Sequence, residues 1–305
     1  MKRITLLAGQ NSENYGEKLT YFQALEVLKD KDVKIYIPTS VKESLHAVFS
    51  SDAVIFAGRR MLGNIDSLDI VTMALEMERP VFFFGVGLGE MRNKGLRKFS
   101  TILMSPLTQG FLTDHISTRW AQLWAGKRVR VGADLCHIYL LTHAKRGKSK
   151  FAVFSPRYNG VLRRYKELKW LPALDARIVV ANHSDSKAAI DVSQHLKTED
   201  IIIVSEPKDV MEVVSNAKFI ISERFHVSLT AESFGVPFIH VGRRAMRYFE
   251  KDFEDNFSLP DEVEMALAFS KIKENVPDHY ERFNERIKKR FEEMLKGLNS
   301  FLMKI

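Results

Sequence analysis

The chain has 305 residues, of which 45% are hydrophobic and 28% are charged, with 16 Gly and 9 Pro. This composition is typical of a globular protein and excludes a disordered or fibrous chain; the length is sufficient for two domains of ordinary size. The formal net charge of +8 and the pI of about 9.4 favour anionic partners. The basic residues are spread over short clusters, so we expect no specific binding of nucleic acid.

Cysteine content and hydropathy limit the chain further. Cys136 is the single cysteine, which excludes an intramolecular disulfide and a metal site built from several cysteines of one chain. The apolar run at residues 4–8 is too short for the core of a signal peptide, and no stretch approaches the roughly 20 apolar residues of a membrane-spanning helix. We therefore expect a cytoplasmic protein without a metal or an organic cofactor.

Short apolar runs alternate with amphipathic segments through the first half of the chain. Strands are predicted at residues 4–8, 33–37, 53–57, 80–84, 110–113 and 128–132. Helices are predicted between them at residues 18–29, 67–78, 93–104 and 114–125. Runs such as PVFFF at 80–84 have no polar face, as expected of parallel strands that are covered by helices on both sides.

The polar segment at residues 142–150 interrupts this alternation and is predicted to be a linker. The alternation then restarts, with strands at 151–155, 176–181, 201–205, 218–222 and 237–241, and helices near 185–196, 207–215 and 226–234. The sequence thus predicts an α/β protein with two Rossmann-like domains, at residues 1–145 and 146–275, whose parallel sheets face a cleft.

Residues 276–305 are predicted to form an amphipathic helix. Apolar residues recur there at spacings of three and four, which places them on one helical face; they are Tyr280, Phe283, Ile287, Phe291, Met294, Leu298 and Phe301. The pattern favours a helix docked across a domain. A dimer seam and a helix lying on a membrane surface are the alternatives.

Ligands of such sheets bind beyond the carboxyl ends of the strands, so the strand-to-helix junctions are the candidate sites. At the first junction, Asn14, Gly16 and Glu17 follow a strand, and their amide and backbone N–H groups suit a phosphate or a sugar. Asn and Gly are also ordinary turn residues. At the second junction, Gly58 directly follows a strand and allows close approach of a ligand to the backbone.

The third junction contains Gly85, Gly87 and Gly89, followed by Glu90. This GxGxG spacing lacks the third glycine of the dinucleotide-binding motif, and no clear acidic strand end follows about 20 residues later. The sequence therefore argues against a nicotinamide dinucleotide.

The fourth junction places Arg224 and His226 where a strand gives way to a helix. A cation at a helix N-terminus costs about 0.3–1 kcal/mol, because the helix dipole is already positive there. An anionic ligand would reverse that penalty, so the pair indicates an anion site. A solvated arginine and a histidine with local hydrogen bonds are the alternative interpretation.

In chain order, and over approximately residues 8–247, these junctions resemble the polysaccharide pyruvyl transferase family. The segments that carry the resemblance are NYGE (14–17), SDAVIFAG (51–58), RPVFFFGVGLGEMRN (79–93), RVRVGADLC (128–136) and SERFHVSLTAESFGVPFIHV (222–241). The last segment is the most specific, because it is similar to the family signature R-[LF]-H-x(5)-A-x(2)-x-G-[VI]-P. At Glu17 the chain departs from the aspartate that is usual in the first motif.

The resemblance implies a fold like that of the two-domain B-type glycosyltransferases. It also implies transfer of pyruvate from phosphoenolpyruvate to two hydroxyls of a sugar, as a ketal, on a cell-surface polysaccharide or its precursor. Arg224 would bind the phosphate, and His226 would donate a proton to the enol. The further candidates for substrate binding are Asn14, Gly16, Glu17, Gly58, Gly85, Gly87, Asp134, Arg243 and Arg244, with Glu17 and Asp134 as candidate bases on the acceptor side.

Two other functions agree with the same basic cleft. A B-type glycosyltransferase would bind the diphosphate of a nucleotide sugar there, and a catalytically silent relative would bind an anion or a glycan without reaction. The expected partners are phosphoenolpyruvate and a sugar or glycan acceptor, with peripheral contact to a membrane-linked glycan. Assembly into a homo-oligomer is a further alternative.

Overall fold

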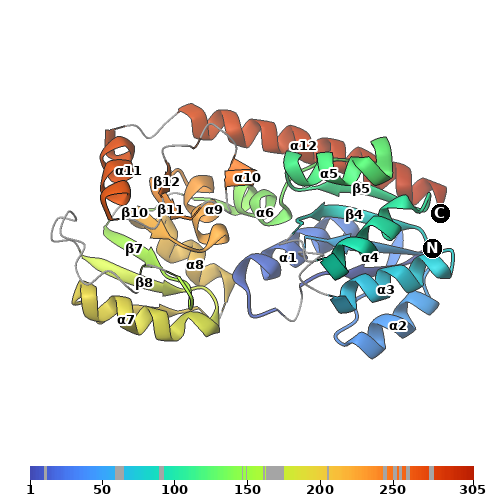
Figure 1. Cartoon of the computed structure of the whole chain (residues 1–305), viewed down its shortest axis with the longest axis horizontal. Coiled ribbons are helices and arrows are strands. Elements are labelled where there is room, and N and C mark those ends of the chain that lie inside the picture. Colours follow the sequence, from blue (N-terminus) through green and yellow to red (C-terminus); the bar gives the residue numbers. More distant parts are fainter. Residues whose placement is uncertain are drawn as a thin grey trace. The chain divides into compact units, whose positions relative to one another are not determined.

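The computed structural model describes residues 1–9, 12–58, 65–88, 93–145, 147–148, 150–160, 162, 175–204, 206–242, 246–249, 253, 256–258, 262–274 and 278–305. The chain forms two compact units. Unit 1 comprises Met1–Ser12, Glu17–Tyr139 and Arg286–Ile305, and unit 2 comprises Glu13–Gly16 and Leu140–Glu285. Each unit has a parallel sheet with helices packed on it (Figure 1).

The sheet of unit 1 has the strand order β2-β1-β3-β4-β5-β6. Its strands are β1 (Lys2–Leu7), β2 (Val33–Tyr36), β3 (Ala53–Ala57), β4 (Val81–Val86), β5 (Thr108–Leu112) and β6 (Val129–Val131). The helices that follow them are α1 (Tyr15–Lys29), α2 (Val41–Phe49), α3 (Ile65–Glu76), α4 (Asn93–Met104), α5 (His115–Ala125) and α6 (Leu135–His143).

The strands of unit 1 are buried on both faces, as their continuous apolar runs predict. Helices α2 to α5 pack side by side on one face, where the ring of Phe83 in β4 lies 6.0 Å from that of Phe99 in α4. The other face is covered by the second half of α12 (Asp278–Lys304). There the ring of Phe82 lies 5.1 Å from that of Phe301. Successive residues of β4 therefore pack against helices on opposite faces of the sheet, Phe83 against α4 and Phe82 against α12.

Unit 2 has the strand order β12-β11-β10-β7-β8-β9. Its strands are β7 (Phe151–Ser155), β8 (Ala176–Val180), β9 (Ile201–Ile203), β10 (Ala217–Ser222), β11 (Phe238–Val241) and β12 (Phe257–Ser258). The helices are α7 (Ser186–Leu196), α8 (Pro207–Ser215), α9 (Phe225–Ser233), α10 (Met246–Phe249) and α11 (Glu262–Glu274), and a 3-10 turn spans His183–Asp185. Helices α7 and α11 contribute Val192 and Met265 to one apolar core.

The strand orders determine where each sheet can bind a ligand. In unit 2, β7 and β10 are neighbours, with Ser155 opposite Ser222, yet the chain leaves β7 toward β8 and leaves β10 toward β11. Unit 1 reverses in the same way between β1 and β3. Such a topological switch point opens a crevice at the carboxyl ends of the two strands, which is the usual binding site in open α/β sheets.

The predicted fold class is confirmed, because two all-parallel sheets with helices occur in the predicted chain order. Helices α2, α6, α10 and α11 and strand β12 were not among the predicted elements. The apolar face of α12 is buried, with Ile287 and Met294 inaccessible to solvent. Each half of that helix packs within its own unit, since Phe283 contacts Phe253 in unit 2.

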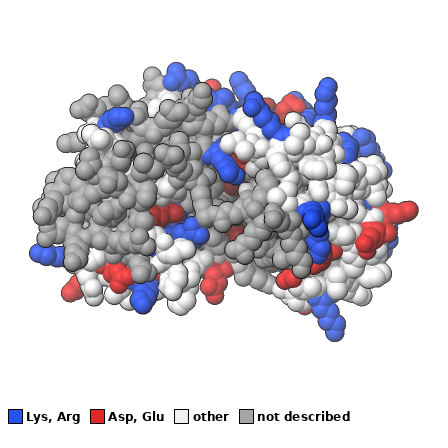
Figure 2. Space-filling view, in the orientation of Figure 1, with Lys and Arg blue, Asp and Glu red and all other residues white. Residues whose placement is uncertain are grey.

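None of the described helices has an apolar stretch that could span the hydrocarbon core of a bilayer. On the face drawn in Figure 2, basic and acidic side chains of the described residues are interspersed. This view therefore shows no large surface of a single charge.

The packing of α12 gives a direct test. Replacing the buried Phe301 by alanine should lower the free energy of unfolding by about 3 kcal/mol, because the contact with Phe82 is lost and a cavity remains. Met303 lies on the same helix but is 77% exposed, so Met303→Ala should change stability by less than about 0.5 kcal/mol. Urea unfolding of both variants measures the difference, and equal effects would contradict the docking of α12 on the sheet.

Candidate active site

The guanidinium of Arg224 is held by a carboxylate at the switch point of unit 2. Arg224 is the N-cap residue of α9, two residues beyond β10. Its Nε donates to Oδ2 of Asp185 at 2.6 Å, and its Nη2 donates to Oδ1 of the same carboxylate. The Asp185 side chain is fully buried, and that of Arg224 is 19% exposed. The two bonds fix the plane of the guanidinium, and the described residues supply no hydrogen-bond partner for Nη1.

Asp185 joins three strand ends. It follows β8, it pairs with the arginine that follows β10, and its Oδ1 accepts a hydrogen bond from the backbone N–H of Tyr158, which follows β7, at 2.9 Å. Glu223 acts similarly, because Oε2 accepts from the N–H of Arg157 at 2.9 Å and Oε1 from that of Leu162 at 3.3 Å. Two carboxylates therefore hold the backbone at Arg157, Tyr158 and Leu162, the described part of the segment that follows β7.

His226 lies in the first turn of α9 and is partly buried. Its ring centroid is 4.9 Å from that of Phe225, and its carbonyl accepts from Oγ1 of Thr230 at 2.7 Å. The first backbone N–H groups of a helix have no partner within the helix, and the dipole is positive there. The start of α9 thus places a histidine and an oriented arginine beside an anion-binding helix terminus.

The segment 13–16 belongs to unit 2 and packs against His226. A Cβ on Gly16 would lie 2.1 Å from both Cγ and Nδ1 of the imidazole, so only glycine fits there without displacement of the ring. The N–H of Gly16 donates to Oδ1 of Asn14 at 3.0 Å, and the hydroxyl of Tyr15 lies 2.9 Å from Oγ1 of Thr230. The structure therefore brings the first and fourth junctions together.

Glu17 lines a different site, a cavity of about 320 Å³ in unit 1. The cavity lies at the carboxyl ends of β1 to β3 and is bordered by the first turns of α2 and α3. Hydroxyls and two carboxylates provide its polar lining, in particular Ser12, Glu17, Thr39, Ser40, Asp66 and Ser67. Such a lining suits a ligand with many hydroxyl groups.

Two of the predicted glycines are tightly packed. A Cβ on Gly58, which follows β3, would lie 1.8 Å from Cγ2 of Thr20. Gly85 adopts a φ of 65° at an irregularity of β4, and its Cβ would lie 2.6 Å from the carbonyl oxygen of Ala133. Packing alone therefore requires glycine at both positions, and a role in substrate binding stays a prediction.

The remaining predicted residues are Gly87, Asp134, Arg243 and Arg244. Gly87 has ordinary space for a side chain. Asp134 is buried at the start of α6, where Oδ1 accepts from the N–H of Cys136 at 2.9 Å. Arg243 and Arg244 lie outside the described residues.

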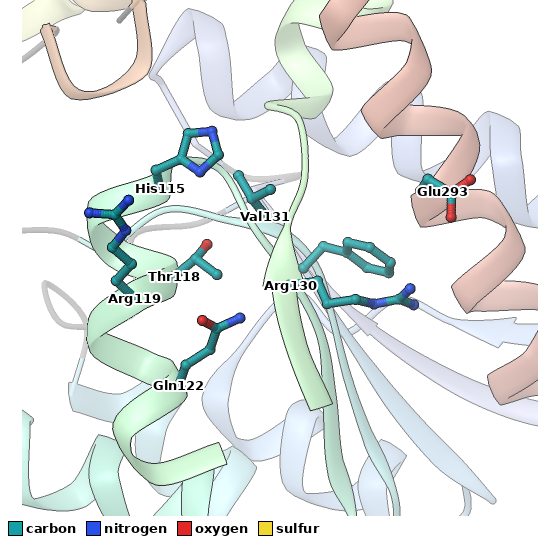
Figure 3. A pocket seen from close by; sticks show the side chains of 8 residues that line it. His115, Thr118, Arg119, Gln122, Arg130, Val131 and Glu293 are labelled. Atoms are coloured by element: carbon teal, nitrogen blue, oxygen red, sulfur yellow. The ribbon is translucent and has the colours of Figure 1, made fainter. Parts of the chain in front are cut away.

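A second cavity of about 390 Å³ lies at the edge strand of unit 1 and contains none of the predicted site residues. Figure 3 shows its lining, with His115 and Arg119 on α5, Arg130 on β6 and Glu293 on α12. The guanidinium of Arg130 lies 4.5 Å above the ring of Phe111. At the switch point of unit 2, by contrast, Arg224 is held in place by Asp185.

A family model for polysaccharide pyruvyl transferases matches residues 12–244. The chain belongs to this family. The matched range contains the 222–241 signature with Arg224 and His226. No curated protein matches the chain.

Solved structures of low sequence identity share the fold. The UDP-GlcNAc 2-epimerase from Neisseria meningitidis bound to UDP-GlcNAc is 12% identical with a TM-score of 0.64, and the match covers 100% of both chains. Anabaena HepE, in complex with UDP and glucose, is 9% identical with a TM-score of 0.60 and the same coverage. The epimerase from Methanocaldococcus jannaschii is 12% identical with a TM-score of 0.60, over 88% of this chain and 92% of that chain. These likenesses show the B-type glycosyltransferase-like architecture of two Rossmann-like units.

Family membership places the protein among the polysaccharide-modifying transferases. The two carboxylates that hold this candidate site together, those of Asp185 and Glu223, were not predicted from the sequence. An acidic residue a few positions beyond the predicted strand 176–181 was an available signal for Asp185. Glu223 lies inside the signature segment, but no sequence pattern predicts its hydrogen bonds with the backbone N–H groups of Arg157 and Leu162.

The contact between Gly16 and His226 predicts the effect of one added methyl group. Gly16→Ala should destabilise the protein by about 1–3 kcal/mol, since the new Cβ overlaps the imidazole and overpacking costs this much. Gly87→Ala is the matched control, because its Cβ would meet Oγ1 of Thr113 at an ordinary 3.5 Å. Urea unfolding compares the two variants, and an unchanged midpoint for Gly16→Ala would refute this packing.

Proposed function

We propose that the protein transfers the pyruvyl group of phosphoenolpyruvate to two hydroxyls of a sugar and releases phosphate. The observation that carries this proposal is the start of α9, where the Asp185–Arg224 pair stands two residues from a partly buried histidine. The family signature lies on the same residues. The reaction needs an anion site and a proton donor side by side, and this helix terminus offers both.

Arg224 and the N-terminus of α9 would bind the donor. Phosphoenolpyruvate carries a phosphate and a carboxylate, and both suit an arginine and helix N–H groups. Because Asp185 holds Nε and Nη2, the guanidinium would present Nη1 to the ligand. A partly buried arginine that is already oriented loses little conformational entropy on binding. Asp185 is therefore a positioning residue in this proposal.

His226 would act as the general acid. Protonation of the methylene carbon of the enol makes the methyl group and leaves positive charge on the adjacent carbon, which the first sugar hydroxyl attacks. The second hydroxyl then displaces phosphate from that carbon. One hydroxyl proton ends in the methyl group, by way of His226, and the other leaves with the phosphate. Arg224 would stabilise the departing charge.

The sugar acceptor would bind in the cavity of unit 1. Glu17 and Asp66 supply carboxylate acceptors there, and serine and threonine hydroxyls supply partners of both kinds. Glu17 is one of the two candidate bases predicted from the sequence, the other being Asp134. None of the described residues that line the cavity carries a positive charge, which suits a neutral sugar.

The donor part of the proposal is tested by binding and turnover of phosphoenolpyruvate. The ligand should raise the melting temperature of the wild-type protein, because it stabilises the folded state by mass action. Arg224→Lys should weaken binding by about tenfold or more, since a fork bonded to Asp185 is replaced by a point charge. His226→Asn should keep binding and lose roughly 100-fold or more of phosphate release.

Arg177→Lys is the control, because Arg177 also pairs with an aspartate of unit 2, Asp200, at 3.2 Å, but on β8 and away from α9. It should behave as wild type in both measurements. A melting shift with UDP-sugars, and none with phosphoenolpyruvate, would instead favour a nucleotide-sugar enzyme, as the ligands of the solved structures suggest. No response to either ligand would reject both functions.

The acceptor part is tested by steady-state kinetics with a panel of methyl hexosides. With the most active sugar, Glu17→Gln and Asp66→Asn should each raise KM by about tenfold, because a hydrogen bond to a charged group contributes roughly 1.5–3 kcal/mol. The affinity for phosphoenolpyruvate should not change. Glu76→Gln, at the opposite end of α3, is the control, and equal KM values for all three variants would refute this location of the acceptor.

A further inference from the structure

Helices α4 and α5 of unit 1 expose large apolar side chains to solvent. Leu123 is 75% exposed, Ile116 55% and Met104 53%, and the ring of Trp124 is also accessible. Single exposed apolar residues are common, but a group of them on two neighbouring helices indicates an interaction surface. These side chains have no part in either of the two proposed substrate sites.

The exposed residues of α5 fall on one helical face. Ile116, Arg119 and Leu123 follow one another at spacings of three and four residues, and Lys127 lies just beyond the helix in the 3-10 turn Gly126–Arg128; all four are exposed. Such spacing aligns side chains along a helix. Apolar and basic side chains therefore alternate along a single exposed stripe, and Figure 3 shows Arg119 directed away from β6.

Helices α4 and α5 pack against each other beneath this stripe. The ring of Trp120 stacks on that of Phe99 in α4, with centroids 5.7 Å apart and planes 8° from parallel. In α4, Arg97 and Met104 are exposed and lie two turns apart. The outer surfaces of α4 and α5 thus form one continuous face, the α4–α5 face: Arg97, Met104, Ile116, Arg119, Leu123, Trp124 and Lys127.

The charge of this face has one sign. Residues 93–128 contain a single acidic residue, Asp114, which is buried and caps α5 by accepting from the N–H of Ser117 at 2.8 Å. Asp69, on the neighbouring α3, is ion-paired with Lys98. The described residues give Arg97, Arg119 and Lys127 no carboxylate within ion-pair distance.

A second exposed apolar stripe shows why the charge matters. On α2, Val41, Leu45 and Phe49 are exposed at spacings of four residues, but Glu43 lies beside them and bonds to Thr39. That stripe has mixed charge and no preference for an anionic surface. The α4–α5 face combines unpaired cations with Trp, Leu and Ile, which is the composition of helices that lie in the headgroup region of a bilayer.

We propose that the α4–α5 face binds the anionic surface of a lipid bilayer. Arg97, Arg119 and Lys127 would contact the acidic headgroups, and Leu123 and Trp124 would enter the boundary with the acyl chains. The described helices include none that could cross the bilayer, so the contact is peripheral. Binding to vesicles can be measured without substrate, so its outcome is independent of the proposed reaction.

The test is cosedimentation of the full chain with vesicles of phosphatidylcholine, with and without phosphatidylglycerol. The wild-type protein should bind the anionic vesicles much more strongly, and the emission of Trp124 should shift to shorter wavelength. The double variant Arg119→Glu, Lys127→Glu should bind at least about tenfold more weakly, since each basic residue near an anionic surface contributes roughly a fivefold factor. Trp124→Phe should lose the spectral shift.

Matched variants in unit 2 are the controls. Lys187→Glu with Lys208→Glu changes the net charge equally, and Ile190, 51% exposed on α7, matches Ile116 in type and exposure. Ile116→Glu should weaken binding and Ile190→Glu should not. Equal losses from both sets, or no binding to anionic vesicles, would overturn the proposal. Self-association that Ile116→Glu abolishes, without vesicle binding by the wild type, would show a protein interface and would also overturn it.

Discussion

The site in unit 2 depends on the ion pair between the buried Asp185 and the partly buried Arg224. Desolvation of two charges offsets most of their attraction, so such a pair adds little net stability, whereas removal of one partner costs about 3–5 kcal/mol. Its main effect is geometric. The carboxylate follows β8, the guanidinium follows β10, and the backbone N–H of Tyr158 connects the loop after β7. The positions of three strand ends are thereby coupled to the orientation of one arginine.

Because the charges of Asp185 and Arg224 have opposite signs, the pair also lowers the net positive charge at the start of α9. With Asp185 bound to it, Arg224 has a directed N–H and little net positive field, so affinity cannot come from charge alone. In the proposed donor site, an anion would have to place an oxygen within reach of both the guanidinium and the first N–H groups of α9. Directed contacts of this kind give specificity more than affinity. The proposed site would therefore select ligands by the position of their oxygen atoms more than by their charge.

Sequence reasoning predicted the sheets because buried parallel strands are continuous apolar runs, as at Val81–Val86, and it located Arg224 and His226 at a helix start from their position after β10. Helix α2 is only nine residues long, and so short a segment offers little periodicity to recognise. The contact of Gly16 with His226, and that of Asp185 with Arg224, join segments far apart in the chain. No periodicity encodes such pairs, since strand order creates them.

The course of α12 has a consequence for biosynthesis. Residues 286–304 cover the face of the unit 1 sheet that includes Phe82, and the ribosome adds them after all of the strands. Unit 2 needs nothing beyond residue 285. Although unit 1 holds most of the earlier half of the sequence, it is thus completed last. While the nascent chain grows, an aromatic sheet face stays uncovered, and such surfaces recruit chaperones or aggregate.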